Sequence, residues 1–524
     1  MSYPKDSTKY PDALCMTTYL DGENDGNILH SVISPSGKEI NIGNDVDIAM
    51  KLAMESDSTE LDSTANRRIR LKADLFILPL VCMIYAVQMM DKITNGSAVV
   101  MGLEEDLKMK GDMYSWTGSG FYLGYLFFEF PASYIVQRYS LSKCGAIFIF
   151  LWGTVLCLCS TPNYAGFQFL RVVLGMLESA ITPIFVIITS QWYKKEEQYI
   201  RSAIWFSSCG IGVTLGSSIA LGCFIHQGSF SIAGWKVLFI ITGLLTVVLA
   251  VFFYFWIPDS PATAWFLNPE ERIQAAQRIK SNQQGFGNKH FKWSQFKEAW
   301  TDYRTYIYFF FGVAICVPNG GLTTFGNIVL VSILGYGVED SLRFSIYQGL
   351  IEFFGCLIIV STVRYIKHRM VICIFGCSLN LALSCMLAFS TNPHVRLGGF
   401  MCLGMSVIGI FTMLSCFSSN VAGHTKKITV NAAFLVAYGA GNIIGPQTFI
   451  SNQAPQYVGG QIGMVVGYSV SLVLAITLYA SYYYDNKRRD KLVAEGKIEA
   501  VKNKSNIAFA DLTDKENPYF RYSL

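Results

Sequence analysis

Long uncharged blocks of hydrophobic residues alternate with short polar stretches along most of this chain. A helix needs about 20 residues to cross a bilayer whose hydrocarbon core is about 30 Å thick. The blocks lack the strict alternation of barrel strands, so they favour membrane-spanning helices. They predict six spans in the first half, at 73–92, 115–135, 144–160, 166–190, 202–222 and 236–257, and six in the second, at 306–331, 344–362, 370–389, 397–418, 429–451 and 461–484.

The two apolar halves have similar lengths and are joined by a polar insert, a pattern that predicts an all-α membrane protein of twelve transmembrane helices in two six-helix bundles. Inside the insert, the sequence Asn-Pro-Glu-Glu at 268–271 is typical of a helix start and predicts an amphipathic helix over 269–280. The expected organisation is a disordered tail over 1–66, an N-terminal bundle over 67–257, a central loop over 258–303, a C-terminal bundle over 304–484 and a tail over 485–524.

Lys and Arg gather at alternate ends of the predicted spans, and this asymmetry predicts the orientation of the chain. One set of flanks holds Arg67, Arg68, Arg70, Lys72, Arg138, Lys143, Lys194, Lys195, Arg201, Arg364, Lys367, Arg369, Lys426, Lys427, Lys487, Arg488, Arg489 and Lys491. The opposite loops hold only Lys108, Lys110, Lys236, Arg343 and Arg396. Both termini are therefore expected in the cytoplasm, and the plasma membrane is the expected location, with the endoplasmic reticulum or vacuole as alternatives.

The composition agrees with a membrane protein, since 52% of the residues are hydrophobic and 15% are charged, against roughly 25% charged in a soluble domain. The chain has no phosphate-binding loop, no HExxH or paired Cys/His metal spacing and no nucleophile elbow. We therefore expect no enzymatic activity, no metal and no cofactor. The basic residues form no nucleic-acid surface, and we expect a monomer whose partners are the bilayer and a small molecule.

Ionisable side chains inside hydrocarbon are costly, so those within the spans are functional candidates. They are Asp91, Lys92, Glu129, Arg171, Glu178 and Glu352. Arg171 and Glu178 are seven residues apart and share one helix face, with Gly175 between them where a helix or a ligand could approach. A structural ion pair bracing two helices is the alternative for these two residues.

Asp91 and Lys92 are expected at the end of the first span, pointing about 100° apart, which gives them different roles. The alternative for this pair is a lysine that snorkels to the membrane surface beside a solvated aspartate. Glu129 and Glu352 are each either a proton relay or a neutral packing group.

Two spans contain proline, glycine and uncharged polar residues, in PNGGLTTFGN (318–327) and YGAGNIIGPQTF (438–449). Such residues either line a cavity or allow bending and close helix packing. The polar candidates for substrate contact are Asn319, Thr323, Asn327, Asn442 and Gln447.

Several stretches from about residue 73 to the end resemble the major facilitator superfamily, and within it the anion:cation symporters of the fungal allantoate permease branch. These stretches include MDK, YSWTGSGFYLGYLFFEFPASYIVQR, RVVLGMLES with the following Pro183, IPDSPATAWFLNPEER, PNGGLTTFG, GNIIGPQTF and the tail DLTDKENPYFRYSL. The resemblance implies that Arg171 and Glu178 serve substrate binding and proton transfer, and that Asp91 and Lys92 play similar parts. It also implies a gate at Arg138, where Gln137 replaces the usual acid.

The resemblance implies a proton-coupled symporter that imports a small organic anion by alternating access, for example allantoate, a vitamin acid or another carboxylate. Lys92 and Arg171 would attract the carboxylate, while Asp91 and Glu178 would carry protons as the coupling ions. One alternative is a transporter of a neutral solute such as a sugar or vitamin, because IPDSP resembles a sugar-porter motif. Another is a nutrient sensor with a transporter fold, which the long N-terminal tail permits.

Overall fold

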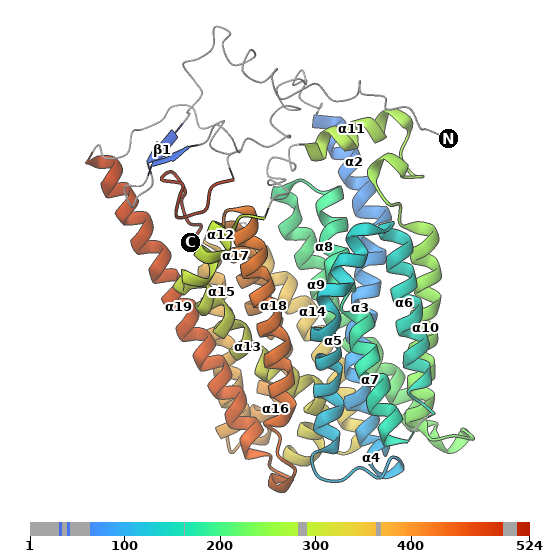
Figure 1. Cartoon of the computed structure of the whole chain (residues 1–524). Coiled ribbons are helices and arrows are strands. Elements are labelled where there is room, and N and C mark those ends of the chain that lie inside the picture. The colour runs from blue at the N-terminus through green and yellow to red at the C-terminus, as the bar shows by residue number, and fades with distance from the viewer. Residues whose placement is uncertain are drawn as a thin grey trace, which may run out of the picture.

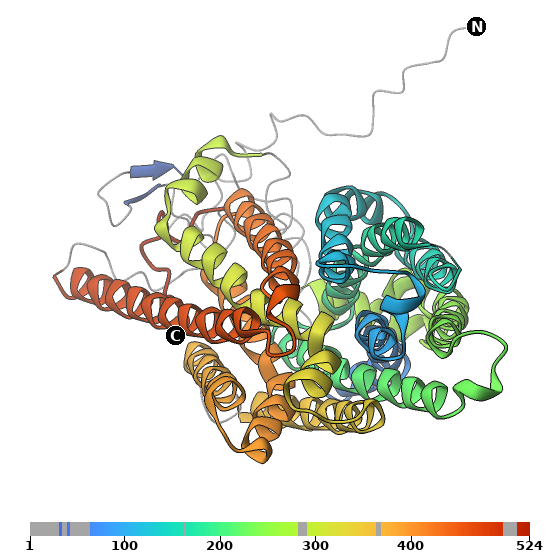
Figure 2. The same ribbon diagram turned by 90° about the horizontal axis from the view of Figure 1, so that it is seen from below.

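The computed structural model describes residues 31–33, 39–41, 63–161, 163–280, 291–362, 368–495 and 511–524. Its long helices run side by side in two groups, the first coloured blue to green and the second yellow to red (Figures 1 and 2). The disordered tail predicted over 1–66 lies mostly outside the described residues. Within it, β1 (Ser31–Ile33) pairs antiparallel with β2 (Glu39–Asn41), and α2 begins at Ser63.

The N-terminal bundle is built from helices whose apolar side chains form one continuous core. Its members are α2 (Ser63–Phe76), α3 (Leu78–Val100), α5 (Met113–Arg138), α6 (Leu141–Leu158), α7 (Tyr164–Glu178), α8 (Ile181–Trp192), α9 (Lys195–Ile225) and α10 (Gly234–Trp256). The short α4 (Leu103–Asp106) and η3 (Gln227–Ser229) lie in its loops.

The C-terminal bundle has its own apolar core and a similar set of helices. They are α13 (Tyr303–Ile328) with the π-turn η6 (Val329–Ile333), α14 (Val338–Ser361), α15 (Arg369–Phe389), α16 (Pro393–Cys402), η8 (Leu403–Ser406), α17 (Val407–Asn420), α18 (His424–Gln447), η9 (Ser451–Gln453) and α19 (Val458–Ala494). Between the bundles the chain forms η4 (Pro261–Thr263), α11 (Pro269–Lys280) and α12 (Trp293–Thr301).

Within the described residues, eleven helical stretches are long and apolar enough to span a membrane, counting α2 with α3 and α7 with α8 as single stretches. The remaining long helix, α5, has 26 residues and lies among the helices of the N-terminal bundle (Figure 1). The predicted all-α fold of two bundles is confirmed. The helix expected over 269–280 corresponds to α11.

The first span extends further than the sequence indicates, because α3 continues past 92 to Val100. The residues that follow Lys92 are polar, and each finds a partner on another helix. Asn95 Nδ2 donates to Thr117 Oγ1 at 2.9 Å, and Asn327 Nδ2 donates to Ser97 Oγ at 3.1 Å. Asp91 and Lys92 therefore lie inside the span rather than at its end. At the far end of the chain, α19 likewise continues beyond 484.

The two linker helices lie on different bundles at the end of the molecule that we call the α11 end, which is uppermost in Figure 1. On α11, Glu271 pairs with Lys72 of the N-terminal bundle at 2.6 Å, and Arg278 pairs with Glu197. On α12, Glu298 pairs with Lys426 of the C-terminal bundle at 2.9 Å. Ion pairs thereby connect α11 to the N-terminal bundle and α12 to the C-terminal bundle.

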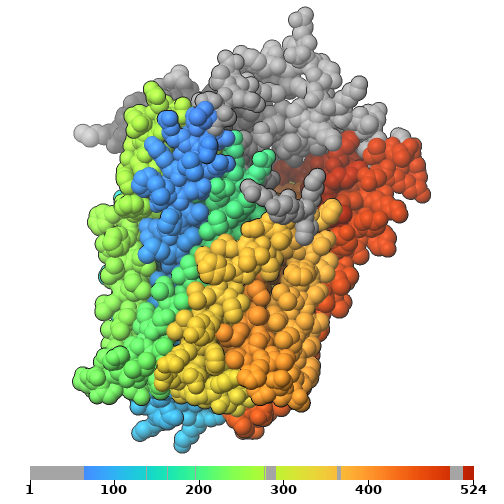
Figure 3. Space-filling view, turned by 180° about the vertical axis from the view of Figure 1, so that it is seen from behind, coloured from blue at the N-terminus to red at the C-terminus, as the bar shows by residue number. Residues whose placement is uncertain are grey.

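The bundles meet along close helix crossings, and the space-filling view shows their surfaces in contact (Figure 3). A methyl group on Gly210 of α9 would come within 2.4 Å of the carbonyl oxygen of Gly349 on α14, so this crossing requires glycine. Between α5 and α18, Ser119 Oγ donates to the Ile443 carbonyl at 2.8 Å. These contacts hold the two bundles together.

Candidate functional site

The fourth span is broken next to Glu178. The helix α7 ends at Glu178, and α8 begins at Ile181. Pro183 accounts for the break, because its ring clashes with the carbonyl four residues earlier and it has no N–H to donate. Near this break, Gln88 of α3 donates a hydrogen bond to the backbone carbonyl of Glu178 at 3.4 Å. The carboxyl group of Glu178 is thus placed at a helix end inside the span.

Two cations and one carboxylate converge between α3, α5 and α7. Lys92 Nζ lies 3.9 Å from Glu178 Oε2. The Arg171 guanidinium lies 5.2 Å from the centroid of the Phe121 ring, and Lys92 Nζ lies 5.8 Å from the same centroid. An aromatic ring attracts cations to its face, so Phe121 helps to hold both basic groups in place. We call Lys92, Phe121, Arg171 and Glu178 the charged cluster.

The sequence places Arg171 and Glu178 on one helix face, and the structure has both buried on α7. The ion pair of Glu178 is formed with Lys92 of α3, so an ion pair does connect two helices of this bundle. Gly175 lies against another helix, because a methyl group there would come within 1.9 Å of the Phe121 carbonyl oxygen. The close approach at Gly175 is therefore made by α5.

Asp91 points to a different part of the bundle from Lys92, as the 100° between adjacent helical residues predicts. Its Oδ2 accepts a hydrogen bond from Thr246 of α10 at 3.3 Å, and the residue is 0% exposed. Lys92 retains 14% side-chain exposure and faces Glu178. The alternative of a snorkelling lysine beside a solvated aspartate is therefore wrong.

Several buried polar atoms in this region have no hydrogen-bond partner. They are Asp91 Oδ1, Arg171 Nη1 and both carboxylate oxygens of Glu178. The Arg171 Nε, in contrast, donates to the Thr117 carbonyl at 3.3 Å. Buried polar atoms in folded proteins are nearly always hydrogen-bonded, so such a group of exceptions is a candidate for binding a ligand or a proton.

Uncharged polar groups of the C-terminal bundle lie across from the charged cluster. Asn319 Nδ2 of α13 donates to Asn442 Oδ1 of α18 at 3.1 Å, and Asn442 Nδ2 donates to the Tyr438 carbonyl at 2.8 Å. Thr323 donates to the Asn319 carbonyl on the same helix. The ring centroid of Tyr122 lies 5.1 Å from that of Phe121 and 6.2 Å from that of Tyr438, whose carbonyl accepts from Asn442. Tyr122 thus lies between the charged cluster and an amide-rich wall, which we define as Asn319, Thr323 and Asn442.

The other two polar candidates are engaged in contacts between helices. Asn327 donates to Ser97 and accepts a hydrogen bond from Ser345 Oγ at 2.9 Å, so it joins α3, α13 and α14. Gln447 Nε2 donates to Ser119 Oγ at 2.9 Å and joins α18 to α5. For Asn327 and Gln447, these contacts agree with the second interpretation of the sequence, in which the polar residues of these spans serve helix packing.

The two isolated carboxylates lie on different bundles. Glu129 on α5 is 2% exposed, and its Oε2 has no hydrogen-bond partner. Glu352 on α14 packs against η8, where a methyl group on Gly404 would come within 3.1 Å of Glu352 Oε2. Both groups are buried, as either a proton relay or a packing group requires.

Arg138 is the last residue of α5 and lies at the α11 end, with its guanidinium 5.2 Å from the Tyr134 ring centroid. The side chain of Gln137 lies outside what the structure describes. Nearby, the carboxylate of Asp259 accepts hydrogen bonds from Ser140 Oγ at 2.7 Å and the Ser142 backbone at 2.9 Å. Burial acts to raise the pKa of Asp259, but these hydrogen bonds outweigh it and hold that pKa below its usual value.

Sequence reasoning did not identify Phe121, Tyr122 or Thr246. Aromatic residues fill many positions of the spans, so composition does not separate a ring that holds cations from one that faces lipid. The glycines at 118, 120 and 124 are the available signal, since small residues mark the helix face that other helices approach. Phe121 lies three residues before Gly124 and therefore on its side of α5.

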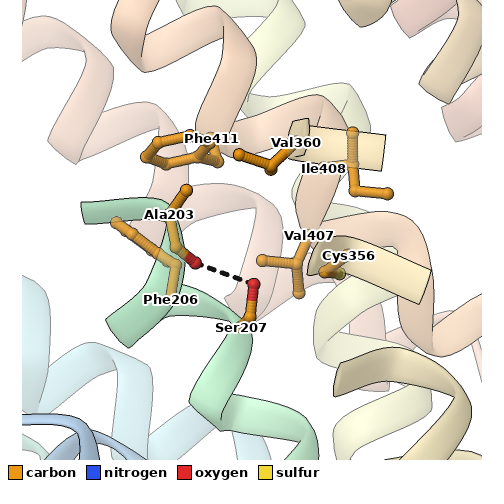
Figure 4. Close-up of a pocket in the computed structure, with 8 residues that line it drawn as sticks. All are labelled: Ala203, Phe206, Ser207, Cys356, Val360, Val407, Ile408 and Phe411. Atoms are coloured by element: carbon orange, nitrogen blue, oxygen red, sulfur yellow. Dashed lines mark hydrogen bonds between the residues drawn. The ribbon is translucent and has the colours of Figure 1, made fainter. Parts of the chain in front are cut away.

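A separate apolar pocket lies where α9 meets α14 and α17 (Figure 4). Ser207 is the hydroxyl residue in its lining, and its Oγ donates to the Ala203 carbonyl at 2.7 Å within the same helix. The pocket therefore presents no free polar group to a solute. Its lining consists of Ala203, Phe206, Ser207, Cys356, Val360, Val407, Ile408 and Phe411.

The arrangement of helices in two bundles is typical of secondary transporters, and comparison with known families agrees. Residues 81–446 match the family model described as Major Facilitator Superfamily. The chain belongs to the Major Facilitator Superfamily, a family of transporters rather than enzymes, and the resemblance to its fungal allantoate permease branch is confirmed.

Among curated proteins, the chain is 45% identical to the allantoate permease of Saccharomyces cerevisiae, over 95% of this chain and 94% of that protein. It is 43% identical to an uncharacterized transporter of Schizosaccharomyces pombe, over 91% and 94% of the two chains. Among solved structures, a bacterial homolog of the human lysosomal transporter Spinster, in an inward-facing and occupied conformation, aligns with a TM-score of 0.57. That alignment covers 77% of this chain and 96% of the other at 13% identity, and it supports the fold alone.

Proposed function

We propose that this transporter imports a small organic anion together with protons. The observation that carries the proposal is the convergence of Lys92 and Arg171 on the ring of Phe121, beside the buried carboxyl group of Glu178. Two cations in a low-dielectric site attract a carboxylate strongly, and the unpartnered Arg171 Nη1 is a donor available to it.

The ion pair between Lys92 and Glu178 supports a simple form of coupling. While Glu178 is charged, it competes with a substrate carboxylate for Lys92. A proton on Glu178 removes that competition and leaves Lys92 to the substrate. Anion and proton therefore favour each other's binding, and by linkage the effect is equal in both directions. Asp91, buried beside Thr246, is the second proposed proton carrier.

The amide-rich wall supports a finer statement about the substrate. Asn319, Thr323 and Asn442 are uncharged hydrogen-bonding groups of the C-terminal bundle, and a substrate would replace bonds that they now make among themselves. A substrate that extends from the charged cluster to this wall has a carboxylate at one end and a neutral polar group at the other. Allantoate, the compound in the name of the yeast relative, has one carboxylate and neutral ureido groups and fits this description.

Alternating access then follows from the two-bundle fold, with the site opening in turn to each side. On the orientation that the basic flanks predict, the α11 end faces the cytoplasm, and Arg138 is a gate residue there. Glu129 and Glu352 are proposed relays for protons between the site and the two sides. We place the protein in the plasma membrane as a monomer.

The test is uptake of radiolabelled substrates at acidic pH, in cells that lack related carriers. The panel contains allantoate, other monocarboxylates, and neutral sugars and vitamins as controls. We expect accumulation of at least one monocarboxylate and its loss when a protonophore collapses the proton gradient. Uptake of a neutral solute that anions do not inhibit would contradict the proposal. Unchanged flux after removal of residues 1–62 would count against a sensor whose tail controls transport.

A further inference from the structure

The last described segment, residues 511–524, folds back onto the α11 end of the C-terminal bundle beside α12 (Figure 1). Its sequence is DLTDKENPYFRYSL, one of the stretches that carry the family resemblance. The proposed transport mechanism gives this segment no role. Its contacts with the bundle are numerous and specific, and they are independent of the charged cluster.

A buried lysine receives one of its three carboxylate partners from this segment. The side chain of Lys426 is 1% exposed, and its Nζ lies 2.9 Å from both Glu298 Oε1 and Asp302 Oδ2. Asp514 Oδ1 of the segment approaches still closer, at 2.7 Å. Burial raises the pKa of Glu298, although the positive charge of Lys426 acts to lower it.

Tyrosine and arginine side chains form a second part of the contact. The Arg304 guanidinium of α13 lies 4.4 Å from the ring centroid of Tyr522, which also stacks on Tyr482 of α19 at 4.8 Å. The Tyr522 hydroxyl donates to Asp514 Oδ2 at 2.7 Å, and Arg489 Nη2 donates to the Asp514 carbonyl at 2.5 Å. The acidic and aromatic residues of the segment are thus held as one unit.

Two asparagines of the bundle each hydrogen-bond the backbone of one residue of the segment, through both its N–H and its carbonyl group. Asn420 Nδ2 donates to the Ser523 carbonyl at 2.9 Å, and its Oδ1 accepts from the Ser523 N–H at 2.7 Å. Asn486 makes the same pair of bonds with Tyr522, both at 2.9 Å. Main-chain hydrogen bonds with side-chain pockets between them are how proteins recognise bound peptides.

We propose that the C-terminal bundle contains a peptide-binding site for an acidic, tyrosine-containing segment, and that residues 511–524 of the same chain occupy it. Attachment in the same chain gives the segment a high effective concentration at the site. Thr513 Oγ1 of the bound segment donates to Glu298 Oε2 of α12 at 2.9 Å, and Asp514 pairs with Lys426 of α18, so the segment adds a second link between α12 and the C-terminal bundle. This inference does not depend on which solute is carried.

The first experiment cuts the segment free after folding. A protease site is inserted between residues 496 and 510, the purified full-length protein is cleaved, and size-exclusion chromatography follows the fragment. We expect the fragment to elute with the transporter and to be displaced by excess synthetic 511–524 peptide. Immediate loss of the fragment, or equal displacement by a scrambled peptide, would overturn the proposal.

The second experiment measures affinity on a chain that ends at residue 495. Fluorescently labelled 511–524 peptide should bind this chain saturably, whereas the full-length protein, with its site already filled, should bind it far more weakly. A peptide with Asp514→Asn should bind at least about tenfold more weakly, because it loses a charged hydrogen bond to Lys426. Equal affinity of the two peptides would contradict the proposed recognition of Asp514 by the site. If the shortened chain does not fold, the cleaved protein decides the question with the same two peptides as competitors.

Discussion

Lys92 Nζ on α3 lies 3.9 Å from Glu178 Oε2 on α7, within the membrane-spanning part of the N-terminal bundle. Both carboxylate oxygens of Glu178 lack a hydrogen-bond partner, and Lys92 is the cation that pairs with this carboxylate. A proton or a substrate anion that alters one partner therefore alters the other. The mechanism can be tested at Lys92, Arg171 and Glu178.

Glu178→Gln should abolish concentrative uptake while leaving substrate exchange across the membrane measurable. The amide cannot carry the proton, but it also does not compete for Lys92, so the binding of the anion survives. Counterflow and gradient-driven accumulation in proteoliposomes measure the two activities separately. Glu339→Gln is the matched control, because Glu339 pairs with Arg343 at an exposed end of α14. Accumulation by Glu178→Gln against a gradient would exclude this residue as the proton carrier.

Arg171→Ala should weaken substrate binding, because it removes the buried donor that we propose binds the carboxylate. Truncating one partner of a buried charged pair costs about 2–5 kcal/mol, which corresponds to a rise in KM of roughly 30-fold or more. Arg343→Ala, at an exposed position, is the control for loss of a positive charge. A normal KM in folded Arg171→Ala protein would mean that Arg171 has a structural role.

Replacements of Lys92 separate charge from shape. Lys92→Arg should retain part of the transport activity, since the positive charge near Phe121 and Glu178 remains, whereas Lys92→Gln should lose it. Uptake at saturating substrate, normalised to protein at the cell surface, compares the two. Robust transport by Lys92→Gln would remove this residue from the site.

The substrate specificity of the site provides a further prediction. The amide-rich wall has no cation for a second carboxylate, so a dianion would leave one charge buried without a partner. Succinamate, which has one carboxylate and one amide, should therefore inhibit allantoate uptake more strongly than succinate at a pH where both acids are ionised. Equal inhibition would contradict the one-carboxylate arrangement, while the absence of any inhibition by monocarboxylates would count against anion transport itself.

The sequence predicts the number of bundles and the linker helix well, because both depend on local patterns. Apolar length identifies spans, and the Pro-Glu-Glu start identifies α11. The site is harder to predict, because its geometry depends on contacts between helices. Hydropathy places the end of the first span at Lys92, since the polar residues at 94–97 resemble a loop. Their hydrogen bonds to α5 and α13 keep them inside the bundle.

The partner of Glu178 also depends on contacts between helices, so the sequence does not predict it. Spacing on one helix associates it with Arg171, whereas only the packing of α3 against α7 brings Lys92 to it. Asn327 and Asn319 also look alike in sequence, yet one joins three helices and the other lies in the amide-rich wall. Local pattern identifies the candidate residues, and only tertiary contacts show which helices each of them joins.

The close approach of α5 and α7 provides a test on stability, because it sets the spacing of the charged cluster. Gly175→Ala places a methyl group 1.9 Å from the Phe121 carbonyl oxygen, which is backbone and cannot move alone. Overpacking of this kind costs about 1–3 kcal/mol or more, so we expect a lower midpoint of thermal unfolding in detergent. Displacement of α7 also moves Arg171 away from Phe121, so the surviving protein should show a raised KM.

Gly398→Ala on α16 is the matched control, since nothing lies within 4 Å of the added methyl group. Alanine in a helix is favoured over glycine by about 0.5–1 kcal/mol, so this variant should be unchanged or slightly stabilised. The two substitutions are chemically identical and are predicted to shift the unfolding midpoint in opposite directions. Fluorescence-detected size-exclusion after a temperature series measures both. A Gly175→Ala protein as stable as Gly398→Ala, with an unchanged KM, would show that α5 and α7 do not fix the geometry of the charged cluster.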